Sequence, residues 1–185
     1  MSTSFDNERF KKELSFYKQV SIKDAVDYRM AGVLPIVDIL GHPFIVNIKV
    51  GELLPKGNYS SAGLDLINGG WYDFQTNQHC FYYHTSQMKE ANISPDITVL
   101  PKNVVLVKIP APAQLDPIGM ARKNKVEPAV YLKDFPQLIY HKAMIIPLEE
   151  TILVDVVKSN KLKVIAGTSK LKLRKVRYKN KGPSL

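Results

Sequence analysis

Apolar residues recur at helical spacing in the first thirty positions of the chain. Phe10, Leu14 and Tyr17 fall on one helical face, which predicts a helix over residues 6–18. A second helix is expected to begin after Ser21, because serine is a favoured N-cap residue. The glycine and proline that follow near residue 32 are typical of a helix end.

The middle of the chain carries short β-branched and alternating runs. Residues 36–40 and 44–49 are expected to form a hairpin, and residues 71–74 and 79–84 a second one. The apolar run 104–107 lies between turn signals and predicts a buried strand. The pattern therefore favours a mostly antiparallel sheet.

Helices are predicted again in the second half. Asp116-Pro117 is typical of a helix start, since aspartate caps and proline suits the first helical position. A short helix is expected over 128–135, a strand over 143–146 and a helix over 148–159.

Alternation of apolar and basic residues returns near the C-terminus. Leu162 and Val164 alternate with lysines before a glycine-containing polar segment, and Leu171 and Leu173 do so after it. Such a pair of runs is typical of a β-hairpin. The pleat of the strands would place the apolar side chains on one face and the cations on the other. The pattern predicts a basic two-stranded ribbon over residues 161–179.

The fold class predicted from these elements is α+β: a mostly antiparallel sheet with short flanking helices and a C-terminal basic β-hairpin. The length of 185 residues, with 45% hydrophobic and 23% charged residues, fits a single domain, 1–185, carrying a basic segment, 158–185. A single cysteine argues against a disulfide scaffold. We expect a cytoplasmic protein without a membrane partner, because no signal-peptide pattern or long apolar run occurs.

Positive charge is concentrated at one end of the sequence. The net charge is +9, and residues 158–185 hold ten Lys or Arg and no Asp or Glu. The rest of the chain has 16 basic residues against 17 acidic ones. This asymmetry indicates a polyanionic partner.

The favoured hypothesis is a non-enzymatic, nucleic-acid-binding or nucleoprotein-associated accessory protein. A basic ribbon fits the major groove, and its cations neutralise phosphates. The side chains expected to contact phosphates are Lys161, Lys163, Lys170, Lys172, Arg174, Lys175, Arg177 and Lys179.

Two other interpretations of the basic segment stay open. Lysines on an edge strand can serve only to prevent aggregation. Alternatively, a structural or adaptor subunit of a larger assembly, of the phage, secretion or defence type, could dock the segment on an acidic protein surface.

Six aromatic residues fall within residues 71–83. They could stack bases on an exposed sheet, or they could pack against one another across strands. The candidates for base stacking are Trp71, Tyr72, Tyr82 and Tyr83.

Catalytic and metal-binding signatures are not recognised in the sequence. His79, Cys80 and His84 offer ligand atoms, but neighbouring residues of a strand point to opposite faces, so we expect no metal and no cofactor. An enzyme with an unrecognised carboxylate or histidine site remains an alternative. The scattered candidate carboxylates are Asp38, Asp65 and Asp73.

The segment 61–66, Ser-Ala-Gly-Leu-Asp-Leu, resembles the first motif of the trimeric dUTPase family. The resemblance covers six residues. The phosphate motif Arg-Ser-Gly-Leu-Ala and the motif Gly-x-Ile-Asp-x-Asp-Tyr of that family do not occur in this sequence. The short resemblance therefore does not imply dUTPase activity for this chain.

Overall fold

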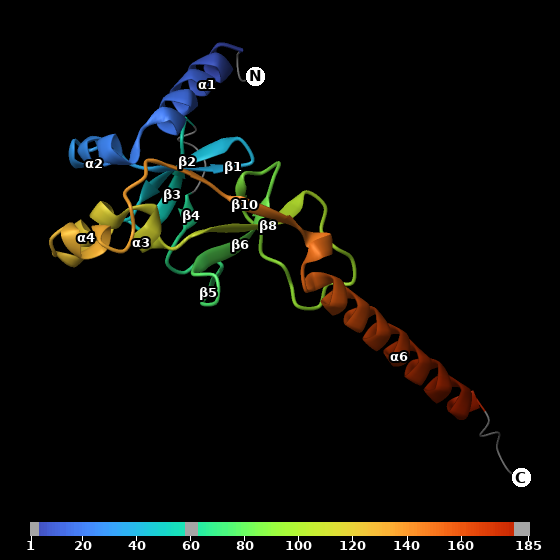
Figure 1. Ribbon diagram of the computed structural model, residues 1–185. Helices are drawn as coiled ribbons and strands as arrows, with labels where there is room; N and C mark the ends of the chain where they lie inside the picture. The colour runs from blue at the N-terminus through green and yellow to red at the C-terminus, as the bar shows by residue number, and fades with distance from the viewer. Residues whose placement is uncertain (1–3, 58–62, 180–185) are drawn as a thin grey trace, which may run out of the picture. The chain divides into compact units, whose positions relative to one another are not determined.

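The computed structural model describes residues 4–57 and 63–179, with side chains described within 12–57 and 63–166. The chain divides into two compact units. The first unit comprises Met1–Ala91 and Asn103–Ile146, and the second comprises Asn92–Lys102 and Pro147–Leu185. The fold is α+β and contains two five-stranded, mostly antiparallel sheets (Figure 1).

The first sheet has the strand order β4-β3-β2-β1-β9. Its central hairpin, predicted from the sequence, is confirmed and turns at Leu40 and Gly41, whose φ angles are 56° and 83°. Strand β9 adds to β1 in parallel, unlike the other pairs of this sheet. The strands are β1 (Ile36–Ile39), β2 (His42–Asn47), β3 (Glu52–Pro55), β4 (Leu64–Asp65) and β9 (Tyr140–Lys142).

The second sheet has the order β10-β8-β6-β5, with β7 also paired to β6. The aromatic hairpin predicted from the sequence is confirmed as the β5–β6 pair, in which Trp71 lies opposite Cys80. The strands are β5 (Trp71–Asp73), β6 (Gln78–His84), β7 (Lys89–Glu90), β8 (Val104–Pro110) and β10 (Met144–Pro147).

One hydrophobic core joins the two sheets of the first unit. Val37 and Phe44 from the first sheet belong to the same buried cluster as Tyr83 and Val107 from the second. The rings of Phe44 and Tyr83 meet edge to face, with centroids 6.2 Å apart. Burial of such apolar side chains is the main driving force for the fold.

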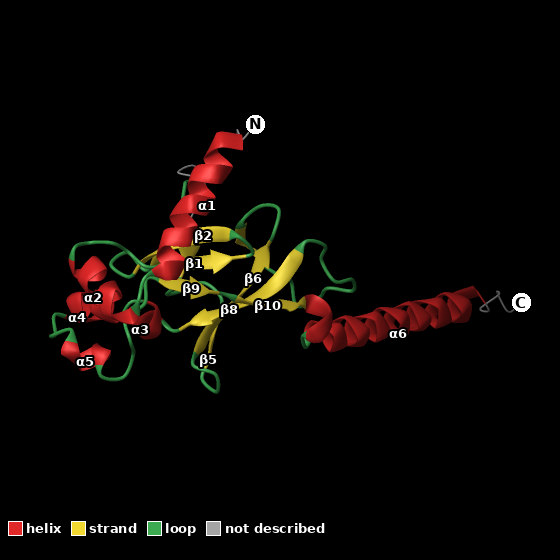
Figure 2. Ribbon diagram, turned by 45° about the horizontal axis from the view of Figure 1, so that its top comes forward, coloured by secondary structure: helices red, strands yellow, loops and turns green. Residues whose placement is uncertain are grey.

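The first unit also contains helices whose ends follow from the sequence. The hydroxyl of Ser21 accepts a hydrogen bond from the Asp24 backbone N–H, which confirms the predicted N-cap. The carboxylate of Asp116 likewise accepts from the Gly119 N–H. Helices α2 and α4 lie at the same end of this unit (Figure 2). The helices are α1 (Ser4–Gln19), α2 (Ile22–Met30), α3 (Pro112–Leu115), α4 (Pro117–Asn124) and α5 (Ala129–Leu132).

The second unit is dominated by one long helix. A 3-10 turn, η1 (Leu148–Glu150), precedes α6 (Leu153–Lys179), a helix of 27 residues. The predicted basic β-hairpin over 161–179 is therefore wrong, because these residues continue α6. Among the helices that the structure describes, none combines the length and hydropathy needed to cross a membrane.

Residue type explains why the alternating pattern of α6 does not form strands. The segment is rich in Leu, Lys and Arg, all strong helix formers, whereas strands favour β-branched and aromatic residues. The preceding turns already form a helix that packs through Leu153 and Val157, so extension adds one hydrogen bond per residue without a new nucleus. Gly167 costs such a helix only about 1 kcal/mol relative to alanine.

Candidate nucleic-acid interface

The first turns of α6 are anchored within the second unit. Leu153 and Val157 are buried, and so is Asn160. The Asn160 side-chain amide donates hydrogen bonds to the carbonyl oxygens of Pro95 and Ile97, at 2.7 and 2.9 Å. The sequence analysis missed this role, although Asn160 shares the helical face of Leu153 and Val157.

Beyond Asn160, the described side chains of α6 are all exposed, through residue 166. Asp155 is the last acidic residue of the chain, and it pairs with Lys158 at 3.2 Å on an exposed surface. A pair of this kind contributes little stability. Neither Lys161 nor Lys163 pairs with a carboxylate among the described side chains, so their charge is available to a partner.

The other predicted phosphate contacts lie further along the same helix. Their backbone continues α6 as far as Lys179, whereas their side chains lie outside the described residues. These residues are Lys170, Lys172, Arg174, Lys175, Arg177 and Lys179.

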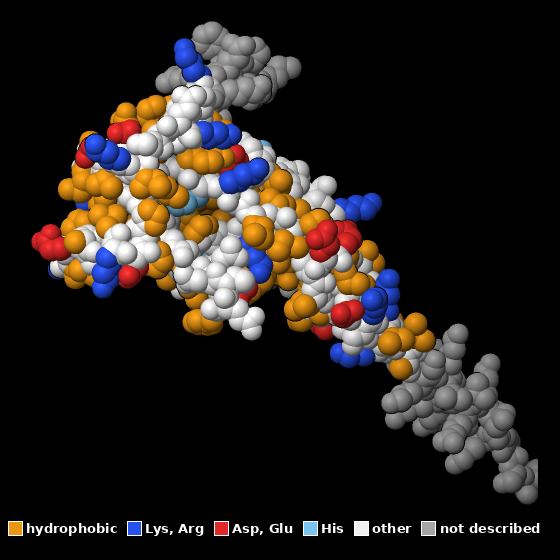
Figure 3. Space-filling model, viewed as in Figure 1, with side chains coloured by type: hydrophobic (Ala, Val, Ile, Leu, Met, Phe, Trp, Pro, Cys, Tyr) orange, Lys and Arg blue, Asp and Glu red, His pale blue; other side chains and the backbone are white. Residues whose placement is uncertain are grey.

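Apolar side chains are also exposed in this region. Leu162 is 68% exposed, and Ile152, just before the helix, is 77% exposed. Figure 3 shows lysine and hydrophobic side chains interspersed along the described part of α6. The surface of the helix is therefore cationic and apolar together.

Of the four candidates for base stacking, Trp71 has the most exposed side chain. It is 42% exposed, and its ring lies 5.2 Å from that of the half-buried Tyr82. Tyr83 is fully buried, and burial raises its pKa to about 12. A base therefore has no access to the Tyr83 ring.

The remaining stacking candidate, Tyr72, is engaged within its own hairpin. Its hydroxyl donates to the side-chain oxygen of Asn77, and its ring contacts Phe74 edge to face at 4.8 Å. Phe74, which was not among the candidates, is 87% exposed. Its position next to the hairpin turn was the available signal, since a turn residue has no sheet face to cover it.

Two of the three candidate carboxylates stabilise local turns. Asp38 accepts from the Gly41 N–H at 2.7 Å and from the Tyr140 hydroxyl at 3.1 Å. Burial, together with the negative charge of Asp38, raises the pKa of Tyr140 to about 12. Hydrogen bonds from the backbone of Asn68 and Ile67 lower the pKa of Asp65.

The third carboxylate, Asp73, belongs to the β5–β6 hairpin. Its hydrogen bond with Thr76 and its contact with Lys108, at 3.1 Å, lower its pKa to about 2. The three carboxylates thus have separate structural partners, and no contact between described residues brings them into one site.

His79 and Cys80 are neighbours on β6, so their side chains leave opposite faces of the sheet. Burial lowers the pKa of His79 and raises that of the Cys80 thiol, which is the reverse of what a reactive thiolate needs. Within the described residues, no group of three His, Cys, Asp or Glu side chains is arranged to hold a metal ion.

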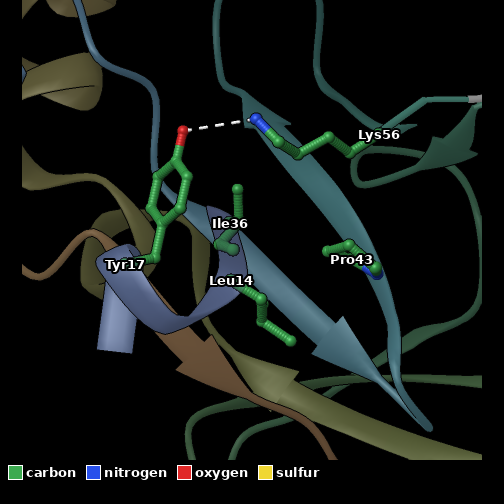
Figure 4. A pocket seen from close by; sticks show the side chains of 5 residues that line it. All are labelled: Leu14, Tyr17, Ile36, Pro43 and Lys56. Carbon is green, nitrogen blue, oxygen red and sulfur yellow. Dashed lines mark hydrogen bonds between the residues drawn. The ribbon is translucent and has the colours of Figure 1, made fainter. Parts of the chain in front are cut away.

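A small hollow lies between α1 and the first sheet (Figure 4). It leaves no room even for a water molecule, and the Lys56 amine lies at its edge, 3.0 Å from Glu13 and 3.4 Å from the Tyr17 hydroxyl. Burial opposes the charge of Lys56, but the hydrogen bonds and charge interactions with Glu13 and Tyr17 together outweigh it and raise the pKa of Lys56. The hollow is lined mainly by Leu14, Tyr17, Ile36 and Pro43, and it is too small for an organic ligand.

Comparison of the chain with family models, with curated proteins and with solved structures finds no match. The most distinctive feature of the chain is therefore its charge distribution. Lys158 and the residues after it, in α6 and beyond, include ten Lys or Arg and no Asp or Glu.

Proposed function

We propose that the protein is an accessory protein that binds nucleic acid through α6. The observation that carries the proposal is the charge asymmetry of one helix. No acidic residue follows Asp155, whereas ten Lys and Arg residues occur in 158–185. The same cationic residues are proposed to contact phosphates as in the hypothesis from the sequence, but they lie on a helix and not on a two-stranded ribbon.

A helix is a suitable element for contact with a duplex. With 27 residues and a rise of about 1.5 Å per residue, α6 is about 40 Å long. The major groove of B-DNA, about 12 Å wide, admits an α-helix. Lysine and arginine contacts to phosphates fix position and orientation, and they carry no sequence information directly.

Counterion release supplies the favourable free energy in this proposal. Each phosphate that a lysine neutralises releases condensed cations, so affinity falls as salt rises. At about 0.1 M salt, one such contact strengthens binding roughly eightfold relative to 1 M salt. Several contacts along α6 would therefore dominate the affinity.

Binding would also stabilise the helix. Cations three or four residues apart on a helix repel one another, as Lys158 and Lys161 do. Phosphates on the partner would remove this repulsion. We therefore expect helix content, measured by circular dichroism, to become more resistant to heating when nucleic acid is added.

The direct test compares two variants that lose the same charge. One variant replaces four lysines of the basic segment with glutamine, and the other replaces four exposed lysines elsewhere. Binding to a labelled DNA duplex, single-stranded DNA and RNA is measured by fluorescence anisotropy. The substituted lysines are Lys161, Lys163, Lys170 and Lys172 in the first variant, and Lys89, Lys102, Lys133 and Lys142 in the control.

The proposal requires the α6 variant to lose more affinity for nucleic acid than the control variant loses. The four-glutamine variant of α6 should bind up to about 4 × 10³-fold more weakly at about 0.1 M salt, with the control much less affected. Equal weakening of both variants would show a response to net charge alone. No binding by the unaltered protein would remove the proposal.

A truncated chain provides a second comparison, and the structure indicates where to end it. A chain ending at Ser159 would lose Asn160 and its hydrogen bonds to the 95–97 segment. Ending after Ala166 keeps this anchor and still removes seven of the ten basic residues. The shorter chain should keep its fold and lose most of its affinity for nucleic acid.

A second candidate function is docking on an acidic protein surface. The exposed Ile152 and Leu162 favour it, because phosphates offer no apolar surface to such side chains. Leu162→Ser discriminates between the two functions. It should leave nucleic-acid binding nearly unchanged, whereas it should weaken docking of α6 in an apolar, acidic groove.

A further inference from the structure

A cleft of about 760 Å³ opens in the first unit, and its lining includes no residue of α6. It is formed by the C-terminal end of α2, the end of β2 with the turn after it, and α4. Its volume lies within the range typical of sites for small organic ligands. The lining residues are Arg29, Gly32, Leu34, Asn47, Ile48, Lys49, Gly119, Arg122 and Lys123.

One arginine of the cleft is held rigidly. The side chain of Arg29 is 7% exposed, and that of Asp116 is fully buried. The Nε and Nη2 atoms of Arg29 donate to the Asp116 carboxylate at 2.9 to 3.0 Å. The same carboxylate caps α4 through the Gly119 N–H, at 2.9 Å. Arg29 is thus fixed in the wall of the cleft before any ligand arrives.

A second arginine of the cleft contacts the end of α2. Arg122, on α4, donates from Nη2 to the Met30 carbonyl oxygen at 3.4 Å. Lys123 on α4 and Lys49 after β2 add two exposed amines from different elements. Four cations from three parts of the chain therefore meet at one cleft.

The charge of this cleft is unbalanced. None of its nine lining residues is acidic, and the only carboxylate tied to them by a described contact is Asp116, behind Arg29. Four cations against one carboxylate leave a net charge of +3. Basic residues in the last turns of α2 and α4 also suit the helix dipoles, which favour Arg29, Arg122 and Lys123 there, but they do not explain Lys49.

We infer that this cleft binds the phosphate groups of a small phosphorylated ligand of nucleotide size. The exposed guanidinium of Arg122 can bind phosphate oxygens in fork geometry, the buried Arg29 adds its charge from the wall, and the two lysines add mobile point charges. The partly exposed Leu34 provides apolar surface for an uncharged part of the ligand. The inference is independent of nucleic-acid binding by α6, since the cleft contains no residue of that helix.

The test is isothermal titration calorimetry of the full chain with pyrophosphate, ATP and adenosine as probes. The cleft variant carries Arg122→Gln and Lys123→Gln, both exposed positions that leave the core intact. The matched control carries Lys133→Gln and Lys142→Gln, also exposed in the first unit. Each variant loses two positive charges.

Pyrophosphate and ATP should bind at ligand concentrations below about 1 mM, and adenosine should not. The cleft variant should bind both phosphates at least about tenfold more weakly, with the control within about twofold of the unaltered protein. Tighter binding of ATP than of pyrophosphate would show that the cleft also recognises the nucleoside. Equal losses in both variants, or adenosine binding as tightly as ATP, would overturn the inference.

The four-glutamine variant of α6 separates this inference from the proposed function. It should bind ATP like the unaltered protein while losing affinity for nucleic acid. Loss of ATP binding in that variant, with ATP binding retained in the cleft variant, would assign phosphate binding to α6 and overturn the inference.

Discussion

The buried ion pair between Arg29 and Asp116 leads to a quantitative prediction about stability. The substitution Asp116→Asn keeps the size of the side chain and an oxygen that can still accept from the Gly119 N–H. It removes the negative charge that faces Arg29. The new amide donors would also point toward guanidinium donors, because the carboxylate now accepts from Arg29 with both oxygens.

The expected loss is large because both groups are buried. Asp116 is 0% exposed and Arg29 is 6% exposed, so water cannot solvate the remaining charge without local rearrangement. Removing one partner of such a pair typically costs about 3–5 kcal/mol. For a protein of this size, that corresponds to a fall in Tm of roughly 10 °C.

Urea unfolding followed by the fluorescence of Trp71 is the appropriate assay. Trp71 is the only tryptophan of the chain and lies on β5, in the same unit as the ion pair. Asp134→Asn provides the matched control, since this carboxylate is exposed in the same unit. The control should change the free energy of unfolding by less than about 0.5 kcal/mol.

A double-mutant cycle with Arg29→Met completes the test. Replacing both partners should cost less than the sum of the single changes, because no unpaired charge remains buried. A loss below about 1 kcal/mol for Asp116→Asn, or additive single effects, would refute the assignment of a tightly coupled pair.

Three further predictions concern the two sheets and their contacts. Gly70→Ala should destabilise the first unit by at least about 1–2 kcal/mol in urea unfolding, because φ is +63° and the new methyl group would collide with the Cys80 carbonyl oxygen; unchanged stability would contradict this backbone geometry. Tyr83→Phe should raise the free energy of unfolding by about 1 kcal/mol, since the buried hydroxyl has no described partner, and a loss of that size would reveal one. Burial lowers the pKa of His141, so below about pH 6.5 the unfolded chain binds protons that the folded chain does not, and stability should fall as the pH drops. His141→Gln should reduce that pH dependence of the urea midpoint, and an unchanged slope would assign it to other groups.

Local signals in the sequence predicted many element boundaries. The Ser21 cap and the Asp116-Pro117 helix start act within one helical turn, and the structure confirms both. Strand pairing between neighbours, as in the β5–β6 hairpin, was predicted for the same reason. Interactions of this kind depend on adjacent residues, which a pattern analysis examines directly.

Long-range contacts gave no such signal. Arg29 and Asp116 are 87 residues apart, and their ion pair depends on how α2 and α4 pack. The parallel pairing of β1 with β9 joins Ile36 to Tyr140, also far apart in the chain. The cleft that includes Arg29 could therefore not be predicted, although each of its cations is visible in the sequence.

The error over α6 arose from competition between pattern and propensity. Alternation of leucine with lysine resembles a half-buried strand, yet both residues are strong helix formers. The same limit applies to Trp71 and Tyr83, which looked equivalent as stacking candidates. One is 42% exposed and the other is 0% exposed, because tertiary packing decides which face of the sheet is covered.

The most direct test of the central claim, that α6 binds nucleic acid through its charge, is the salt dependence of binding by the full chain. If six of the eight candidate side chains contact phosphates of a duplex, the slope of log K against log salt should be about −5. Substituting Lys161, Lys163, Lys170 and Lys172 with glutamine should then bring that slope to about −2. A slope near zero for the unaltered protein, or the same slope for both proteins, would contradict the claim.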